Sequence, residues 1–324
     1  LIDCGATAEG TPEYLLQFAF MGSYYAERVL KRPEPKVGLL NIGAEGTMLI
    51  ATIMAVYGSY ISGSVWVGLI FAMISGALVG ALFALLTVTL RANQNVTGLA
   101  MTTFGVGFGN FFGGSLIKLT DSEVPSIALS ATSAYFSRSL PFADSLGWFG
   151  QIFLCYGFLA YVAIVIAFIC AYVLKRTRVG LQLRAVGENP NTADAAGINV
   201  NRYKYVATCV GCMIAGLGGL YYVMDYACGV WSNDAFGDRG WLALALVIFT
   251  IWKPNVAVFA SILFGGLYIL YLFIPTGMNL AVKELYKMLP YVVTIIVLVI
   301  SSMRNKRENQ PPASLGLAYF REER

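Results

Sequence analysis

The sequence of 324 residues has no histidine and little charge, because charged side chains make up only 12% of it. Soluble domains carry about 25% charged residues. Charge is missing altogether from Thr47 to Leu90, from Gln151 to Leu174 and from Tyr205 to Met224. Each run is long enough to cross a hydrocarbon core about 30 Å thick as a helix. The composition therefore excludes a soluble protein and indicates an integral membrane protein.

The absence of histidine and the low content of charged residues also argue against several kinds of chemistry. Ion-coupled secondary transporters need buried titratable groups, and uncharged spans without histidine offer almost none. An intramembrane enzyme needs a nucleophile with a base, or two facing carboxylates, and neither pattern occurs. Cys209 and Cys212 have a spacing that indicates metal or redox chemistry in soluble proteins, but inside an apolar helix they are typical of packing residues. We expect a non-catalytic protein with no cofactor and no metal site.

What remains is a series of apolar segments. Lipid admits only helices or closed barrels as spans, and apolar runs without strict alternation favour helices. The sequence predicts an all-α, polytopic membrane protein with about nine membrane segments, at 13–30, 43–61, 64–90, 96–119, 151–174, 203–223, 240–252, 255–276 and 285–303. The segment 240–252 suits either a short re-entrant helix or a tilted full span. The transmembrane domain then covers 13–303, between an external segment 1–12 and a tail 304–324.

The basic residues are distributed unevenly between the two sides of the predicted spans. Of the 22 lysines and arginines, 17 fall on one side if the spans alternate, and the other side receives Lys118, Arg138, Arg239, Lys283 and Lys287. Loops rich in lysine and arginine face the cytoplasm. The pattern predicts an external N-terminus, a cytoplasmic C-terminus and a cytoplasmic loop at 175–204.

This loop, 175–204, is a basic, water-compatible island between two uncharged spans. Within it, Asn189 to Gly197 predicts one short helix, since Asn189 is a good N-cap and Pro190 fits the first helical position. Gly197 supplies a left-handed stop. Ala193 and Ala196 are three residues apart and would give the helix a face that a partner can approach closely. An ordinary connector between two spans is the alternative interpretation.

Two strings of residues resemble motifs of a known family. Arg184 to Ile198 resembles the coupling loop of ABC importer permeases of the ribose/simple-sugar and nucleoside type, and Leu39 to Met48 resembles the glycine-rich motif of that family. Thr11-Pro12 and Glu27-Arg28 resemble the nucleoside branch. The similarity covers most of residues 11–310, and the charged, proline-containing stretch from Val29 to Lys36 departs from the family pattern.

The resemblance implies a type II-like ABC importer permease, most similar to those for nucleosides, with a ribose- or galactose-type sugar importer as the alternative and an ion-coupled secondary transporter less favoured. It implies separate cytoplasmic ATP-binding subunits, a second permease chain, identical or different, and an extracellular substrate-binding lipoprotein, in the bilayer of the cell membrane and without nucleic acid. The residues expected to couple to the ATPase are Arg184, Glu188, Asn189, Ala193, Ala196 and Gly197.

Polar and aromatic residues within the spans are candidates for a substrate pathway. An ionisable residue at membrane depth is a functional candidate, and glycines beside Glu45 permit irregular backbone that lines a cavity. A structural role, in which Glu45 caps neighbouring helix ends, is the alternative. Gly105, Gly109 and Gly113 recur every four residues, as do Gly76 and Gly80, which is typical of close helix packing. The pathway candidates are Asn41, Glu45, Asn95, Thr97, Phe104, Phe108 and Asn110.

These candidates carry amides, hydroxyls and rings but little fixed charge. Only Lys118 lies near them as a source of positive field. The aromatic rings could stack on a base or sugar ring, or could simply face lipid. The lining favours a neutral, hydrogen-bonding solute over a nucleotide.

Overall fold

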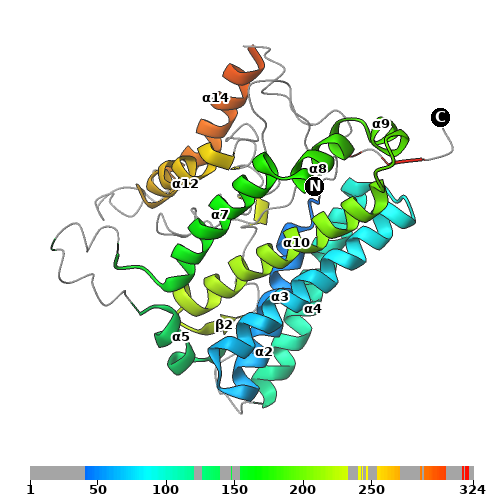
Figure 1. Ribbon diagram of the computed structural model, residues 1–324. Coiled ribbons are helices and arrows are strands. Elements are labelled where there is room, and N and C mark those ends of the chain that lie inside the picture. Colours follow the sequence, from blue (N-terminus) through cyan, green and yellow to red (C-terminus); the bar gives the residue numbers. More distant parts are fainter. Residues whose placement is uncertain are drawn as a thin grey trace.

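The computed structural model describes residues 41–119, 126–138, 147, 154–232, 240–241, 243, 246, 254–270, 285–286, 288–303, 316 and 318–320. The predicted span at 13–30, the N-terminal segment 1–12, most of the short segment at 240–252 and the tail from 304 to 315 lie outside these residues. Regular structure in the described chain is helical apart from two short strands (Figure 1).

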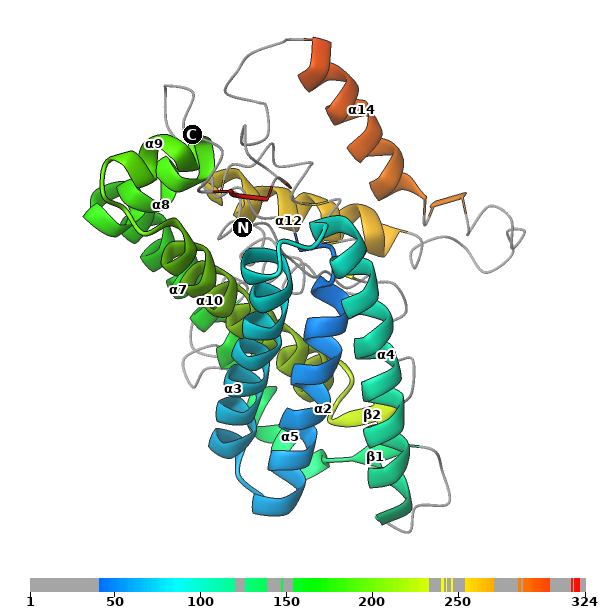
Figure 2. The same ribbon diagram turned by 90° about the vertical axis from the view of Figure 1, so that its right-hand side faces the viewer.

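Four long helices form a bundle in which α2 has a central position. They are α2 Ala44–Ser62, α3 Val65–Ala84, α4 Gln94–Leu119 and α10 Val200–Tyr221. The π-helical turns η1 Leu85–Thr89 and η3 Tyr222–Tyr226 continue α3 and α10. Figure 2 shows α2 between α3 and α4, and α10 packs on both α2 and α3. Most of α2 is therefore buried, whereas α3 exposes apolar side chains along its outer face.

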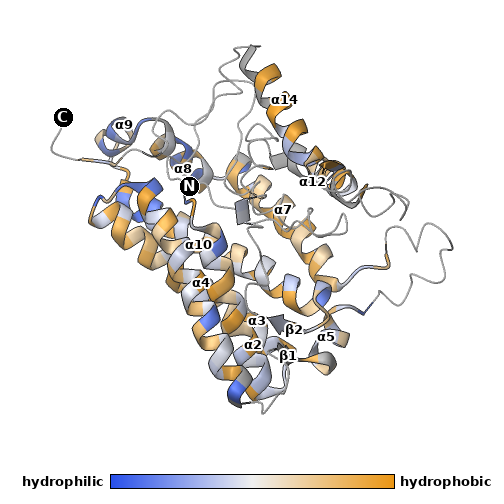
Figure 3. Ribbon diagram, turned by 180° about the vertical axis from the view of Figure 1, so that it is seen from behind, coloured by the Kyte–Doolittle hydropathy of each residue, from blue (hydrophilic) through white to orange (hydrophobic). Residues whose placement is uncertain are grey.

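The remaining helices lie around this bundle. They are α5 Ser130–Phe136, α7 Phe158–Arg176, α8 Arg178–Glu188, α9 Pro190–Ala195, α12 Pro254–Ile269 and α14 Leu289–Met303. Helix α5 lies at one end of the bundle, and α8 and α9 lie at the other (Figure 1). Figure 3 shows hydrophobic residues along α7 and α14 and hydrophilic residues at α9. The uncharged spans and the polar loop that the sequence predicts are therefore also separate parts of the structure.

Among the described residues, three helices are long and apolar enough to cross a membrane, and they cover Ala44–Ser62, Val65–Thr89 and Val200–Tyr226. A fourth candidate is the pair formed by α7 and α8, whose axes differ by 79°. The polytopic helical character is confirmed by these spans. The total of nine segments stays a prediction, because the described residues contain three or four candidate spans and parts of the other predicted segments lie outside them.

Helices of the bundle meet at glycines. A Cβ atom on Gly46 of α2 would lie 2.1 Å from the carbonyl oxygen of Met101, and one on Gly105 of α4 would lie 2.2 Å from the Cα of Gly46. Cβ atoms on Gly76 and Gly80 would similarly come within 3 Å of atoms of α10. The predicted close packing at Gly76, Gly80 and Gly105 is confirmed, because only a residue without a side chain permits backbones to approach this closely.

One short pair of strands accompanies the helices of the described chain. The strand β1 Ser126–Ala128 pairs antiparallel with β2 Val230–Ser232, and Ile127 lies opposite Trp231. Extended segments at helix ends need partners for their backbone N–H and C=O groups, and the strands supply them to each other. Trp231 is fully buried, and its ring lies 3.7 Å from the position that a Cβ on Gly109 would occupy.

Candidate functional site

The predicted pathway residues at the start of α2 lie inside the bundle. Asn41 is fully buried, its Oδ1 accepts a hydrogen bond from the Gly43 N–H at 2.9 Å, and its Nδ2 donates to the Cys212 sulfur of α10 at 3.7 Å. Glu45 is 5% exposed. A Cβ on Gly240 would lie 2.5 Å from the Cβ of Glu45, so the start of the short segment packs against this turn. The geometry favours the structural interpretation of this motif.

The polar cluster at the start of α4 separates into a helix cap and an exposed amide. The Oδ1 of Asn93 accepts hydrogen bonds from the backbone N–H groups of Asn95 at 3.0 Å and Val96 at 3.3 Å, as an N-cap does. The buried Thr97 donates its hydroxyl to the Asn93 carbonyl at 2.8 Å. Asn95 itself is exposed. Of the two predicted contacts, Asn95 is open to a ligand and Thr97 is used by its own helix.

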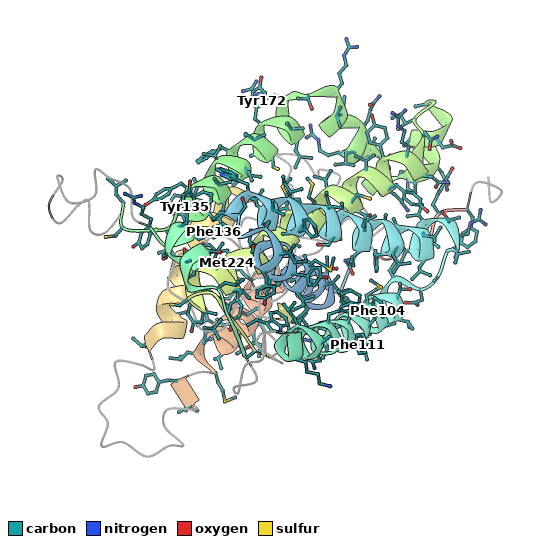
Figure 4. All side chains as sticks on the ribbon, turned by 90° about the horizontal axis from the view of Figure 1, so that it is seen from below. Phe104, Phe111, Tyr135, Phe136, Tyr172 and Met224 are labelled. Carbon is teal, nitrogen blue, oxygen red and sulfur yellow. The ribbon has the colours of Figure 1, made fainter. Side chains whose placement is uncertain are left out.

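Aromatic residues of α4 form a ladder along the helix. Phe104 is 51% exposed, its ring centroid lies 6.0 Å from that of Phe108, and the Phe108 and Phe112 centroids are 4.3 Å apart. Figure 4 shows Phe104 and Phe111 along α4. Asn110 is half-buried on the same helix. The structure therefore brings Phe104 and Phe108 together, with Phe104 exposed and Phe108 packed against buried side chains that include Ile50 and Met101.

The ladder ends beside an apolar hollow of about 370 Å³ between α2 and α4. Phe112, Ser115 and Leu116 line it from α4, and Ile53, Met54 and Tyr57 line it from α2. The sequence analysis missed Tyr57 and Ser115 as candidates. Their signal is weak, since each is a single polar group in a mostly apolar helix.

The predicted helix within the 175–204 loop is present and is preceded by a second one. Asn189 caps α9, because its Oδ1 accepts a hydrogen bond from the Thr192 N–H at 3.1 Å, and Pro190 occupies the first turn. Gly197 has a positive φ of 82°. Thr177 caps α8 in the same way, through the Gly180 N–H at 3.2 Å. The local signals for α9 are confirmed.

Ala193 does not face a partner surface, contrary to the sequence-based expectation. It is 2% exposed and packs with Val186 of α8 and Val200 of α10, whereas Ala196 is exposed. A helix of only six residues has too few internal hydrogen bonds to persist alone, so it buries one face against its neighbours. The small Ala193 side chain lets α9 lie close to α8.

One side-chain hydrogen bond joins the α8–α9 pair to the bundle, a second lies within the bundle and a third within α8. The Tyr203 hydroxyl of α10 donates to Gln182 Oε1 of α8, and the hydroxyls of Tyr205 and Thr89 are hydrogen-bonded, which ties α10 to η1. Within α8, the Nε of Arg184 donates to the Gly180 carbonyl at 3.2 Å. Sequence reasoning did not identify Gln182, Tyr203 or Tyr205.

A polar hollow of about 400 Å³ lies where α9, the start of α10 and the end of η1 converge. Its polar lining comes from Thr89, Arg91, Asp194, Asn199 and Asn201. Gly197 also lines it, so one predicted coupling residue borders a concave surface.

The sequence was compared with known proteins. Residues 34–298 match a family described as the permease component of branched-chain amino acid transport systems. The match covers most of the chain. The protein belongs to this family of ABC transporter permeases. It is a transport subunit and a multi-pass membrane protein, and permeases of this kind work with ATP-binding subunits and a substrate-binding protein.

Individual relatives of this permease cover most of its length. The nucleoside ABC transporter permease protein NupC of Lactococcus lactis is 32% identical over 88% of both chains. The guanosine permease protein NupQ of Bacillus subtilis is 29% identical over 81% of this chain and 82% of the relative. A putative glucose permease protein, TsgC13 of Haloferax volcanii, is 28% identical over 78% and 71% of the two chains. No solved structure matches the permease.

Proposed function

We propose that the permease is the transmembrane subunit of an ATP-driven importer for nucleosides. The observation that carries this proposal is the 32% identity to a nucleoside permease over 88% of both chains. The similarity to the guanosine permease protein NupQ adds support. ATP hydrolysis is assigned to separate cytoplasmic subunits, and delivery of the solute to an extracellular substrate-binding lipoprotein.

The ATP-binding subunits are proposed to contact the exposed side of α9. Asn189, Ala196 and Gly197 are exposed there, and the neighbouring polar hollow of about 400 Å³ has room for partner side chains. Ala193 and Arg184 act from behind this surface, since Ala193 packs in the interior and Arg184 binds within α8. Glu188 is the last residue of α8 and marks the turn into α9.

The substrate is proposed to pass along the exposed face of α4. Asn95 is exposed near the start of α4 and Phe104 is exposed further along, while Phe108 and Asn110 are half-buried on the same helix. Aromatic faces stack on nucleobases and are tolerant of base identity. A face open to one side gives half of a pathway, so we expect a second permease chain, a copy or a different one, to complete it. Asn41, Glu45 and Thr97 hold the helices that shape this face.

Competition for uptake tests the substrate class. Cells that express the complete transporter should take up a radiolabelled nucleoside, and unlabelled nucleosides should compete, whereas nucleoside monophosphates should not, because the face carries no cluster of cations among the described residues. The relative with a putative glucose substrate makes simple sugars the second candidate. Competition by glucose, ribose or galactose, without competition by nucleosides, would select that alternative.

The α8–α9 pair and the C-terminus are proposed to be cytoplasmic, and the N-terminus external, from the bias of lysine and arginine. A single cysteine at Asn191, in a background without the six native cysteines, should react with an impermeant maleimide only after the cells are permeabilised. Reaction in intact cells would reverse the orientation.

A further inference from the structure

The described C-terminal residues, Ala318 to Phe320, are distant in sequence from the α8–α9 pair but lie against it. Figure 1 shows this short red segment beside α9. Tyr319 packs on the cluster of Val186, Ala193 and Val200, which holds α8, α9 and α10 together. The Nζ of Lys204 lies 5.9 Å from the centroid of the Tyr319 ring. The segment is therefore a packed part of this region.

The next residue, Phe320, contacts a different element. The guanidinium carbon of Arg91 lies 4.6 Å from the centroid of the Phe320 ring, within the range of a cation–π interaction. Arg91 lies shortly after η1, the π-helical turn that continues α3. Two consecutive rings thus join the α8–α9 pair to the end of η1.

The backbone of Arg91 supports a role for its side chain. Arg91 has a positive φ of 55°, and beside it the N–H of Ala92 donates to the Leu86 carbonyl at 2.9 Å and closes the helix end. Glycine is the residue of lowest conformational cost at such a left-handed helix stop, and any side chain is disfavoured there. If Arg91 only terminated the helix, glycine would do this better. The cation–π contact with Phe320 is a favourable interaction that an arginine makes here and a glycine cannot.

We propose that Ala318–Phe320 is a strap that fixes the α8–α9 pair to the end of η1, with Arg91, Tyr319 and Phe320 as its positioning residues. This inference rests on the proposed function. The α8–α9 pair is connected to α10 by the chain itself, and the hydrogen bond between Tyr205 and Thr89 links α10 to η1. The strap adds a direct connection from α9 to η1, so that a displacement of α9 by an ATPase moves α3 together with α10.

The transporter reconstituted in proteoliposomes with its ATPases and substrate-binding protein gives the test. Arg91→Gly should keep or raise thermal stability, yet the number of nucleosides transported per ATP should fall about two- to fivefold, the size of one exposed cation–π contact. Phe320→Leu should cause the same loss, because it removes the aromatic ring. Phe320→Trp keeps an aromatic ring and should retain the wild-type number of nucleosides transported per ATP. The double variant Arg91→Gly with Phe320→Leu should be no worse than either single variant. A wild-type ratio in Arg91→Gly, or additive losses in the double variant, would overturn the strap.

Cys228→Gly is a matched control, because Cys228 also has a positive φ, of 51°, at the other end of α10. Cys228→Gly should remove the same conformational cost of a side chain at positive φ without changing the number of nucleosides transported per ATP. An equal loss of coupling in Cys228→Gly would mean that glycine itself is responsible, and would overturn the assignment to the Arg91 side chain.

A second readout separates the strap from the substrate assignment. In the isolated permease without native cysteines, Arg91→Cys and Phe320→Cys should be joined by a short bifunctional maleimide, whatever the transported solute. Val230→Cys in place of Arg91→Cys, an exposed site on β2, should give no cross-link with Phe320→Cys. Absence of the first cross-link overturns the strap even if nucleosides are transported. Its presence supports the strap even if the solute proves to be a sugar.

Discussion

In the bundle, α2, α4 and α10 approach one another through glycines, whereas the α8–α9 pair is held by side chains around Ala193. A Cβ on Gly46 would lie 2.1 Å from a backbone oxygen of α4, which leaves no room for any side chain. Around Ala193 the neighbours are valine, isoleucine and tyrosine side chains, which can change rotamer. The bundle therefore joins rigid backbones, and the α8–α9 pair has contacts that can adjust.

The difference follows from the surroundings of each region. Lipid tails are as apolar as the helices, so spans associate through close van der Waals contact rather than the hydrophobic effect. In water, burying the apolar face of a short helix is favourable in itself. If the α8–α9 pair is the proposed ATPase contact, the transporter combines an adjustable contact where the ATPases act with stiff contacts in the bundle.

The largest expected effect comes from filling one of the backbone contacts. Gly46→Ala places a Cβ against the Met101 carbonyl, and the two helices must separate. We expect a loss of about 3 kcal/mol of stability, at the upper end for an overpacked site. The melting midpoint of the purified permease, with its yield from the membrane, measures this loss.

Gly107→Ala is the matched control on the partner helix. Nothing lies within 4 Å of a Cβ at Gly107, and alanine has the higher helix propensity. The control should melt at the wild-type temperature or above it. Equal destabilisation by both substitutions would show that the bundle does not depend on close backbone contacts.

The second effect contrasts two alanines of the same short region. Ala193→Trp should disrupt the α8–α9 pair by about 2 kcal/mol, because its side chain is enclosed. Protease should then cleave faster within residues 178–200. Ala196→Trp should leave this cleavage rate unchanged and abolish substrate-stimulated ATP hydrolysis by blocking the proposed ATPase contact. If the transporter that carries Ala196→Trp hydrolyses ATP at the normal rate, the ATPase contacts another surface of the permease.

The α8–α9 pair also separates what sequence can predict from what it cannot. The limits of α9 follow from local signals, since Asn189, Pro190 and Gly197 act on backbone groups within a few residues of themselves. The burial of Ala193 depends on Val186 and Val200, which surround it only after α8 and α10 are in place. A three-residue spacing defines a helical face but not which way the face points.

In the bundle, the sequence predicts where the spans lie but not which of their polar residues are open to a ligand. Uncharged runs predict spans that the structure confirms at α2, α3 and α10. Asn41 and Asn95 are both amides near helix starts and look alike in sequence. One is buried against Cys212 of α10 and the other is exposed. Only long-range packing distinguishes them, so a list of polar residues mixes structural groups with candidates for ligand contact.

The third prediction tests this distinction on α4. Asn95→Leu should reduce nucleoside uptake about fivefold, the effect of losing roughly one hydrogen bond, without changing the amount of permease in the membrane. Asn93→Leu removes the cap of α4 and should lower thermal stability as well as uptake. Unchanged uptake by Asn95→Leu would remove the exposed face of α4 from the proposed pathway.

The smallest effect concerns the cap of α9. Asn189→Ala removes the oxygen that accepts from the Thr192 N–H at 3.1 Å, and an N-cap contributes about 1 kcal/mol or less in a short helix. The backbone amides of α9 should exchange with deuterium about two- to fivefold faster, while the amides of the bundle keep their rates, because local opening is independent of the membrane contacts. Asn191→Ala, at an exposed position inside α9, should leave the exchange unchanged. Faster exchange throughout α10 after Asn189→Ala would show instead that the α8–α9 pair and the bundle open as one unit, and the contrast between adjustable and stiff contacts would not hold.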